Sequence, residues 1–575
     1  MRRVLARPPV MVIRRTTYPQ VEPRAAGLMT RAVAVVPPAL PIGEAARLAR
    51  HRRAEVVLAR LGPRWGGATA EVLARALGLG LDRAPLASVL WEAPPVRPTV
   101  SEVAARRRLS AATPFLVVLD DTRPRGVVVR DPAAGGALPR SAAAALARLD
   151  AATLHVLRTA GAEGAQRGWP VAAVGGFPRD LLRGGLAEPP RDLDIVVEGD
   201  GRALARRLAG ALGGQVREHE VFGTATVTVP DERGPRRVDV ATARRERYRV
   251  PGSLPTVEPA PLAADLARRD FSVNALAIHL AEAAWGAVLD PTGGLPDLAG
   301  GRIRILHSLS FIEDPTRIFR AARFAARLGF RVEPTTRRLL AAAAALPVYD
   351  ALSGERLLAE LDAILAEPAP AAILTWLGRA GGFRLLVPTY RFGRRAATLV
   401  GRVEAATAAL PLEPATRRAL YLLALGDGLD AAAWAAWLAR WSAPAPLRTA
   451  AERARAEAPR LLARLDGATR RERAYAVLRG VPEVVAAWAH VLAAGGAPRR
   501  HIVAHLGSWR QVRPLLSGDD VAALGVAPGP LVGRVLEDLK AAQVAGRVRR
   551  REDAAAWVRR AVAKSSHPHP KGGGQ

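Results

Sequence analysis

The spacing of apolar residues changes along this chain of 575 residues and divides it into regions of different structure. From residue 28 to about residue 134, short apolar stretches alternate with short amphipathic ones, which predicts strands and helices in succession. From residue 170 to about residue 306 the pattern stays mixed. Beyond that point Ala, Leu and Arg recur at spacings of three and four between Pro and Gly breaks, so the second half is predicted to be helical.

Two aspartates in the mixed region carry the clearest chemical signal. An apolar run at residues 171–174 is followed by Gly175 and Gly176, by the start of a helix, and then by a second apolar strand, RDLDIVVEG. Because side chains alternate across a strand, Asp192 and Asp194 are predicted to share one face, about 6 to 7 Å apart. Such a pair can hold two Mg²⁺ ions that bind an attacking and a leaving oxygen.

An isolated Asp-x-Asp pair is more often solvated than catalytic. The two glycines shift this balance, because they let a phosphate chain approach backbone N–H groups at a helix N-terminus. Asp239 lies between valines in the predicted strand RRVDVAT, where a carboxylate needs a nearby cation. Alone it would be a strand carboxylate paired with Arg236 or Arg237. With the other two it is predicted to converge on one cation pocket of buried acids.

Composition narrows the classes of protein. A hydrophobic content of 49% over 575 residues suggests roughly four domains. The absence of cysteine excludes disulfides, cysteine-bound zinc and thiol nucleophiles. No apolar run approaches the roughly 18 to 20 residues of a membrane span, so we predict a cytoplasmic protein without a membrane partner. The net charge of +31 favours nucleic acid as a partner, although a GC-rich genome also enriches arginine.

Six signatures occur in a fixed order. They are GGFPRDLLRG, RDLDIVVEG, RRVDVATARRERYRVPGSLPTVEP, DLARRDFSVNALA, LDPTGGLPDLAGGRIRIL and FIEDPTRIFRAARFAARLGF. Together they resemble the class II tRNA nucleotidyltransferase and bacterial poly(A) polymerase family over residues 165–375, and more weakly to about residue 560. The resemblance implies an enzyme that adds nucleotides from CTP and ATP to tRNA 3′ ends with Mg²⁺ as cofactor.

The resemblance also implies roles for individual residues. Asp192 and Asp194 would hold the metal, and Asp239 would orient or deprotonate the 3′-hydroxyl of the RNA. The motif DLARRDFSVNALA, placed at the start of a helix, would contact ribose and triphosphate, and Asp314 and Arg317 would bind the Watson–Crick edge of the base. The nucleotide-binding residues predicted in this way are Gly175, Gly176, Arg179, Arg268, Arg269, Asp270, Asn274, Asp314, Arg317 and Arg320.

Several neighbours have simpler interpretations. Asn274 is as readily an ordinary hydrogen-bonding residue of a helix, and Arg323 and Arg327 fit a solvated basic face. Ser353 and Glu355 begin a helix predicted to brace the template helix, our name for the helix that follows Asp314. The segment PGSLPTVEPAPLAA is predicted to be a Pro-rich, mobile loop. Relatives that add only cytidines are expected to have it shortened, so its presence predicts addition of the terminal adenosine.

Two flanking regions resemble known modules. The doubled pattern of residues 27–140 resembles a tandem pair of cystathionine-beta-synthase (CBS) domains, which implies an adenine nucleotide ligand or a homodimer contact. Val72 and Val129 stand where such domains usually carry Asp and Thr, so structural and sensing roles both stay open. Toward the C-terminus, the resemblance implies a turn before a helix that grips a tRNA phosphate, formed by Gly525, Pro528, Gly529 and Gly533.

The expected fold is an α/β nucleotidyltransferase head of the polymerase-beta type on an all-α neck, body and tail, preceded by an α+β CBS pair. The predicted divisions are a leader at 1–26, the CBS pair at 27–140, the head at 150–306, the neck at 307–375, the body at 376–500, the tail at 501–562 and a disordered end at 563–575. The expected activity is addition of CCA, or part of it, to tRNA, and the alternatives that share these motifs are addition of A alone to CC-ended tRNA and polyadenylation. A non-catalytic, adenylate-sensing RNA-binding protein is the alternative from another class.

Overall fold

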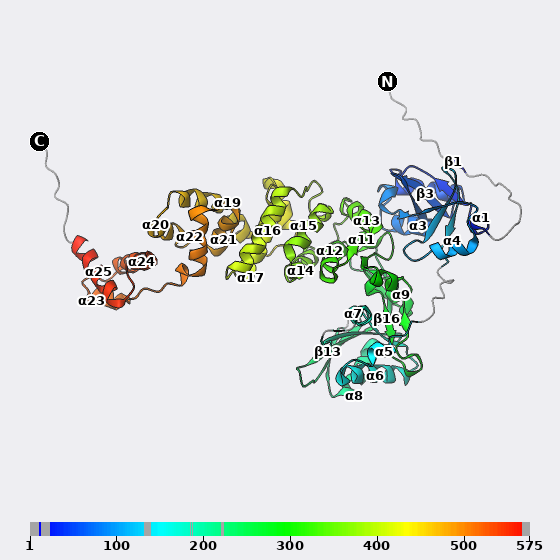
Figure 1. Cartoon of the computed structure of the whole chain (residues 1–575), viewed down its shortest axis with the longest axis horizontal. Helices are drawn as coiled ribbons and strands as arrows, with labels where there is room; N and C mark the ends of the chain where they lie inside the picture. Colours follow the sequence, from blue (N-terminus) through cyan, green and yellow to red (C-terminus); the bar gives the residue numbers. More distant parts are fainter. Residues whose placement is uncertain are drawn as a thin grey trace, which may run out of the picture. The chain divides into compact units, whose positions relative to one another are not determined.

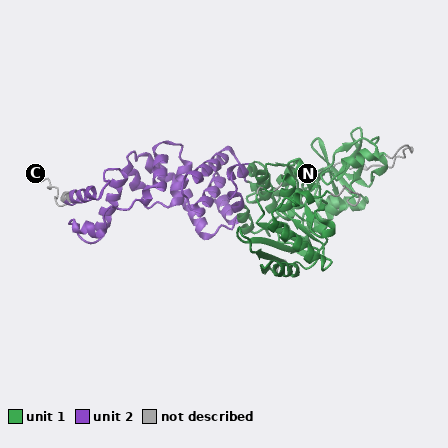
Figure 2. Ribbon diagram, turned by 60° about the horizontal axis from the view of Figure 1, so that its bottom comes forward, with its two compact units in different colours: residues 1–360, 376–389 green, residues 361–375, 390–575 purple. Residues whose placement is uncertain are grey.

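The chain forms two compact units in a computed structural model that describes residues 11–12, 24–131, 140–184, 186, 188–219 and 223–565. Unit 1 contains residues 1–360 and 376–389, and unit 2 contains residues 361–375 and 390–575 (Figure 2). The predicted leader, the connector near residues 132–139 and the predicted disordered end lie largely outside the described residues.

Unit 1 begins with a module in which one pattern of elements occurs twice. In the first copy, a strand and a helix lead into a hairpin, and the first strand pairs parallel with the second, which pairs antiparallel with the third. The second copy repeats these pairings. The first copy consists of β2 (Val33–Val35), α2 (Ile42–His51), β3 (Val56–Leu61), β4 (Arg64–Thr69) and α3 (Ala70–Gly78), and the second of β6 (Pro95–Val96), α4 (Glu102–Arg108), β7 (Phe115–Asp120) and β8 (Arg123–Val129).

This N-terminal module, defined here as residues 24–131, contains three further short elements. One of its strands also pairs with a short strand outside it. The three elements are α1 (Ala25–Leu28), η1 (Leu86–Ser88) and β5 (Trp91–Glu92), and the outer strand is β1 (Met11–Val12), which pairs with β2. Its two sheets have the strand orders β1-β2-β3-β4-β5 and β6-β7-β8. The doubled pattern expected from the sequence is therefore present in the structure.

The head is built on a seven-stranded mixed sheet in the order β11-β12-β13-β10-β9-β16-β17. Helices α5, α6 and α8 cover one face (Figure 1), while α9 packs against the other. The strands are β9 (Val171–Val174), β10 (Asp192–Val197), β11 (Gln215–His219), β12 (Thr224–Val229), β13 (Arg236–Thr242), β16 (Ala277–His279) and β17 (Val288–Leu289). The helices are α5 (Ala143–Leu146), α6 (Ala151–Ala165), α7 (Gly176–Gly184), α8 (Gly201–Leu212), α9 (Leu262–Ala267), η4 (Ser272–Asn274) and η5 (Glu282–Ala284).

Strand β10 fixes the position of the acidic residues. Its apolar side chains Leu193, Ile195 and Val197 are buried in the core on one face, while Asp192 and Asp194 alternate with them and are exposed. The predicted shared face is thus confirmed. Strand β13 runs parallel to β10 with Asp239 directly opposite Asp194, so the sheet brings a residue 45 positions away in the chain beside it.

The remaining elements of unit 1 surround this sheet edge and form the neck. They are β14 (Arg244–Arg247), β15 (Thr256–Pro259), α10 (Gly294–Ala299), β18 (Arg302–Ile303), α11 (Ser310–Glu313), α12 (Thr316–Leu328), β19 (Arg331–Val332), α13 (Pro334–Ala344) and η6 (Gly382–Leu385). Helices α14 (Gly354–Leu365) and α15 (Pro370–Arg379) have residues in both units. The segment predicted to be a Pro-rich loop contains the connection of a β-hairpin, its second strand β15, which pairs antiparallel with β14, and the start of α9.

Unit 2 is helical throughout its described residues, as predicted for the second half of the chain. Its helices are α16 (Arg394–Ala409), α17 (Pro414–Gly426), α18 (Ala431–Arg440), α19 (Ala445–Asp466), α20 (Arg471–Leu478), α21 (Glu483–Leu492), α22 (Gly496–Gly507), η7 (Trp509–Gln511), α23 (Gly518–Ala523), α24 (Pro530–Val544) and α25 (Arg551–Ser565). Among the described residues, no helix is both long enough and apolar enough to cross a bilayer.

The predicted phosphate-gripping turn in unit 2 has the expected backbone in part. Gly525 and Gly529 adopt φ values of 96° and 129°, which favour glycine, and Gly529 is the N-cap of α24. Pro528 precedes that helix, whereas Gly533 lies inside it rather than in the turn. The role of these four residues in tRNA binding stays a prediction.

Candidate active site

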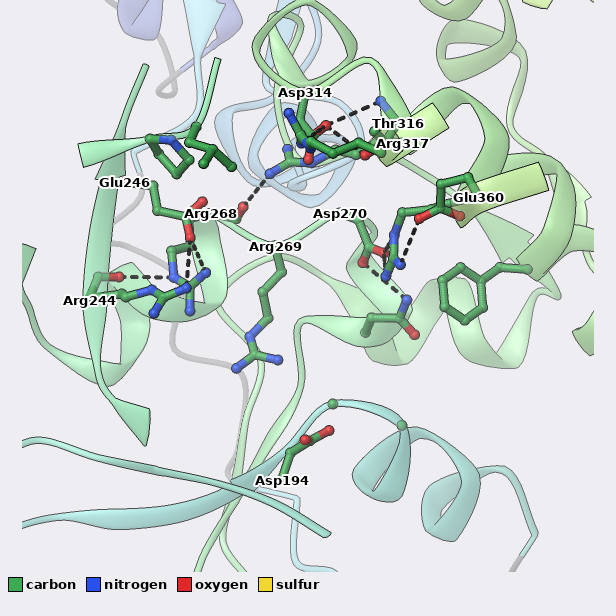
Figure 3. Close-up of a pocket in the computed structure, with 18 of the residues that line it drawn as sticks. Asp194, Arg244, Glu246, Arg268, Arg269, Asp270, Asp314, Thr316, Arg317 and Glu360 are labelled. Carbon is green, nitrogen blue, oxygen red and sulfur yellow. Dashed lines mark hydrogen bonds and ion pairs between the residues drawn. The ribbon is translucent and has the colours of Figure 1, made fainter. Parts of the chain in front are cut away.

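The predicted nucleotide-binding residues line one cavity of about 620 Å³ in unit 1 (Figure 3). All ten lie there together with Asp194, so residues from β9 to α12 meet at one place. Eight arginines and five carboxylates contribute to the lining. Guanidinium groups are well matched to phosphate oxygens, and their excess over carboxylates makes the cavity suited to a polyanionic ligand such as a triphosphate.

The cavity narrows where β9 turns into α7. Gly175 has a φ of 75°, and a Cβ atom at this residue would lie 2.3 Å from Oδ2 of Asp194. A glycine is therefore required for the carboxylate to lie against the start of α7. The predicted Gly-Gly turn thus serves two purposes, since it opens the helix N-terminus to a ligand and leaves room for Asp194.

The surroundings of Asp194 fit a divalent cation. Burial by the protein packed around it raises the pKa of this carboxyl, and the charges of Asp239 and Asp192 raise it further, against Arg269 and Arg237. The residue nevertheless has solvent-exposed surface in the cavity. A carboxylate that is accessible, disfavoured in its charged form and flanked by two others is stabilised by a bound cation.

Asp239 has a different environment from the one predicted. Its carboxylate receives hydrogen bonds from Nε of Arg237 at 3.1 Å and from the hydroxyl of Thr226 at 2.6 Å. Among the described residues, no three His, Cys, Asp or Glu side chains are arranged to hold a metal ion. Asp194 and Asp239 lie side by side on β10 and β13, but Asp239 is paired with Arg237, and Asp192 and Asp194 are exposed rather than buried. The convergence of the three acids on one cation stays a prediction.

A second cavity of about 360 Å³ lies over neighbouring strands β10 and β13, where Asp194 and Asp239 are side by side. Asp194 and Asp239 both line it, and Arg268 and Arg269 lie on the border that it shares with the larger cavity. A group bound there would therefore contact Asp239 on one side and the residues of the nucleotide cavity on the other.

The sequence predicted that the motif containing Arg268 and Arg269 begins a helix. In the structure the two arginines instead follow the end of one. Helix α9 starts after Pro261 and ends at Ala267, and the chain then turns so that Phe271 is buried. Both arginines bind the fully buried carboxylate of Asp265, which the sequence analysis missed. Burial opposes the charge of Asp265, yet Arg269 and Arg268 hold its pKa below its usual value.

The second half of this motif forms a buried network with the template helix. Nε and Nη2 of Arg320 donate to Oδ2 of Asp270 at 3.0 and 2.7 Å, and the amide of Asn274 donates to Oδ1 at 3.1 Å. Nη1 of Arg179 in turn donates to the Asn274 side-chain oxygen at 2.7 Å. Burial opposes the charge of Asp270, but Arg320 and Asn274 lower its pKa. Asn274 therefore binds other protein groups within a short 3₁₀ turn rather than in a long helix.

Asp314 and Arg317 lie at the junction of α11 and α12 and face the cavity (Figure 3). Oδ1 of Asp314 accepts hydrogen bonds from the Thr316 hydroxyl at 2.6 Å and from Arg356 at 2.8 Å. Arg317 donates to the hydroxyl of Ser310 and to the carbonyl of Arg268. The two side chains are thus held in fixed orientations, as selection of a base by hydrogen bonding requires.

Helix α14 braces the template helix, but through residues other than those predicted. Arg356 binds Asp314, and Glu360 binds both Arg320 and Arg323. The four-residue spacing of Arg356 and Glu360 places them on one helix face, which is the signal that could have identified them. Arg323 is buried and ion-paired, so its assignment to a solvated face was wrong, whereas Arg327 is exposed and lines the cavity.

The β14–β15 hairpin supplies an apolar wall to the cavity. Leu254, Pro255 and Val257 line it, and Leu254 is 65% exposed. On the same hairpin, Glu246 accepts a hydrogen bond from Tyr248 and an ion pair from Arg268. Apolar side chains held open to solvent beside a set of arginines provide a surface on which a planar base can pack.

Comparison with known proteins identifies the family. The family model described as "Poly A polymerase head domain" matches residues 171–304. The A-adding tRNA nucleotidyltransferase of Halalkalibacterium halodurans is 34% identical over 71% of this chain and 92% of its own length. That of Geobacter sulfurreducens is 34% identical over 70% of this chain, which spans only 46% of that relative. The CC-adding tRNA nucleotidyltransferase of Deinococcus radiodurans is 36% identical over 66% of this chain and 86% of its own length.

The solved structures agree. The Thermotoga maritima CCA-adding enzyme complexed with tRNA is 29% identical, with a TM-score of 0.61 over 74% of this chain and 99% of that chain. About three quarters of this chain therefore has a counterpart of similar fold in that enzyme. Because it is 34% identical to the Halalkalibacterium enzyme over 92% of that relative's length, the chain belongs to the tRNA nucleotidyltransferase family.

Proposed function

We propose that this protein transfers a nucleotide from ATP or CTP to the 3′ end of a tRNA, with release of pyrophosphate. The observation that carries the proposal is the single cavity that joins Asp194, the Gly175–Gly176 turn, the arginines of the head and the pair Asp314 and Arg317. These are the groups that such a transfer needs, since it requires bound phosphates, a stabilised developing charge and a recognised base.

The protein groups divide this work by position. Arg268, Arg269 and Arg179 bind the triphosphate and hold the α-phosphate near Asp194. The 3′-hydroxyl of the tRNA enters from the side of Asp239, which accepts its proton as the oxygen attacks in line. The guanidinium of Arg237 forms an ion pair with the Asp239 carboxylate. Arg237 must therefore move away before Asp239 can accept the proton of the 3′-hydroxyl. Asp314 and Arg317 bind the edge of the base.

Asp192 and Asp194 are the residues that would hold a divalent cation, for which we propose Mg²⁺. Oxygen ligands on adjacent exposed positions of one strand are the type of donor that Mg²⁺ prefers. When bound, the cation would neutralise charge that develops on the phosphate.

Among the family activities we favour addition of the terminal adenosine. The hairpin that contains Leu254 and Pro255 is present and lines the cavity, whereas relatives restricted to cytidine are expected to have it shortened. Two relatives that match along about 70% of this chain are A-adding enzymes. Complete CCA addition is the second candidate, supported by the likeness to the Thermotoga enzyme over 99% of that chain.

Three tRNA substrates separate these activities. Purified protein would be offered tRNAs that end at the discriminator base, at C or at CC, each with radiolabelled CTP or ATP and Mg²⁺. We expect incorporation of one AMP onto the CC-ended tRNA alone. Incorporation of CMP onto the shortest tRNA would instead establish CCA addition, and long adenylate products would indicate polyadenylation. Absence of any pyrophosphate release under several divalent metals would favour a non-catalytic RNA-binding protein.

We propose further that the N-terminal module is a CBS pair. Its support is the repeated order of strand, helix and hairpin with the same parallel and antiparallel pairings. The hydroxyl of Thr69, at the end of β4, caps α3 by accepting a hydrogen bond from the N–H of Val72. A structural role is therefore favoured over adenine nucleotide binding. We expect AMP, which lacks the triphosphate, to leave the melting temperature of an Asp194→Asn variant unchanged without metal, and light scattering to report whether the module forms a homodimer.

A further inference from the structure

The N-terminal module is docked on the neck through two groups of contacts within unit 1. At one of them Arg338 of α13 donates to the backbone carbonyls of Ala87 and Leu90. Beside it the hydroxyl of Thr335 donates to Glu92 at 3.2 Å. These contacts attach the β5 edge of the module to α13 and fix where the module lies relative to the neighbouring helix α11.

The second contact is an ion pair between the module and the start of the template region. Nη2 of Arg75, in the last turn of α3, lies 2.6 Å from Oε1 of Glu313, the last residue of α11. The Glu313 residue is only 6% exposed, so its charge needs a partner. The other group in contact with its carboxylate is His307, whose pKa burial lowers to about 4, so His307 is neutral near pH 7. Among the described residues, Arg75 is therefore the one permanent cation that contacts Glu313.

Glu313 is joined to both parts of the base-binding site. Asp314 follows it directly, and the backbone carbonyl of Glu313 accepts a hydrogen bond from the N–H of Gly252 at the tip of the β14–β15 hairpin. Arg356 closes this arrangement, because it donates to the carbonyl of Gly252 and to the carboxylate of Asp314, each at 2.8 Å. A Cβ atom on Gly252 would lie 2.8 Å from Cβ of Leu352, so the hairpin tip has little room to shift.

We propose that Arg75 is a positioning residue for base selection, through which the N-terminal module holds Glu313 and hence Asp314 and the hairpin tip in place. The proposal rests on the nucleotide-transfer function proposed above and extends it, because it makes a module outside the nucleotidyltransferase head part of the machinery that selects the base. A ligand or partner that displaces α3 would then change which nucleotide is added without touching the cavity.

The physical reason is the burial of Glu313. Without Arg75 the buried carboxylate loses this cationic partner and must turn toward water, which moves the peptide that carries Asp314. A displacement of about 1 Å in a group that recognises the substrate can reduce catalysis by up to about a hundredfold. Because Arg75 contacts no part of the cavity lining, the effect is expected in the choice of base and not in the binding of tRNA.

The test compares three full-length variants: Arg75→Ala, Arg75→Lys and Arg107→Ala. Arg107 is an exposed arginine on α4 of the same module with no ion pair among the described residues, which makes it a matched control. For each protein kcat and KM would be measured for ATP and for CTP on CC-ended tRNA, together with the dissociation constant for that tRNA and the melting temperature. We expect Arg75→Ala to lower the ATP to CTP ratio of kcat/KM about tenfold, mainly through KM for ATP, with unchanged tRNA affinity. Arg75→Lys should restore most of the ratio, and Arg107→Ala should leave it as in the wild type.

The outcomes separate this proposal from the proposed function. If the wild-type protein incorporates neither nucleotide on any tRNA, the proposed function fails. If it incorporates AMP normally and Arg75→Ala keeps the wild-type ratio, the positioning role alone is overturned. A uniform loss of both activities with a lower melting temperature also overturns it, since that is what a purely structural contact would give. An equal fall in the ratio for Arg107→Ala would contradict it as well.

Discussion

Replacement of Asp194 by Asn is expected to lower the rate of nucleotide incorporation by about three orders of magnitude, while the dissociation constant for tRNA stays within about twofold. The amide keeps the size of the side chain, which matters because the Asp194 carboxylate packs against Gly175. It cannot supply the negative charge that holds a divalent cation. Single-turnover incorporation of labelled AMP and a filter-binding assay with the same tRNA measure the two quantities.

The same substitution should lower activity but raise the stability of the folded protein when no metal is present. Burial and two like charges raise the pKa of Asp194, so the folded protein holds a proton there more tightly than the unfolded chain does. The stability of the folded state therefore increases as pH falls through this raised pKa, and at pH 8 the charged carboxylate is destabilising. We expect Asp194→Asn to melt slightly higher than the wild type in EDTA at pH 8, and Mg²⁺ to stabilise only the wild type. Glu232→Gln, an exposed carboxylate on the same domain, is the control. A wild-type response to Mg²⁺ in the Asp194→Asn protein would place the metal elsewhere.

Replacement of Asp314 by Asn is the second large effect that we expect. The substitution exchanges one hydrogen-bond acceptor for a donor at the base edge, so the ATP to CTP ratio of kcat/KM should fall by about ten- to a hundredfold. A site that recognises a base by hydrogen bonds loses most of its discrimination when one bond is mismatched, because buried polar groups remain unpaired. Competition between the two nucleotides on CC-ended tRNA measures the ratio directly.

Arg356→Ala distinguishes base recognition from bracing in this experiment. Both Arg356→Ala and Asp314→Asn remove the ion pair between Arg356 and Asp314, but Arg356→Ala leaves the Asp314 carboxylate in place. If Arg356→Ala changed the ATP to CTP ratio of kcat/KM as much as Asp314→Asn does, the change would be caused by a shift of the template helix. A change confined to Asp314→Asn would assign recognition to the carboxylate.

The sequence was sufficient where one local rule determined the outcome. Strand alternation placed Asp192 and Asp194 on one face of β10. The ten residues predicted to bind the nucleotide lie together and line one cavity, as the ordered motifs indicated. The periodicity of three and four in the second half correctly predicted helices.

Features that depend on distant partners could not be derived in this way. Helix α9 ends at Ala267, after which the chain turns so that Phe271 enters the core, and this burial has no local sequence pattern. The hairpin of β14 and β15 was hidden by its prolines, which are tolerated at its outer positions. The ion pair between Arg75 and Glu313 joins residues far apart in the chain, and Arg75 alone would be interpreted as an exposed arginine of a helix.

The docking of the N-terminal module has a consequence for synthesis on the ribosome. Arg75 and Glu313 are 238 residues apart, so at about 5 to 20 residues per second the module is made roughly 10 to 50 s before its partner. During this interval residues 24–131 must fold on their own contacts, with the docking face turned to solvent. Arg64 and Arg75 on that face are exposed charged side chains. Charged side chains at the surface disfavour aggregation of the nascent chain before the neck has been synthesised.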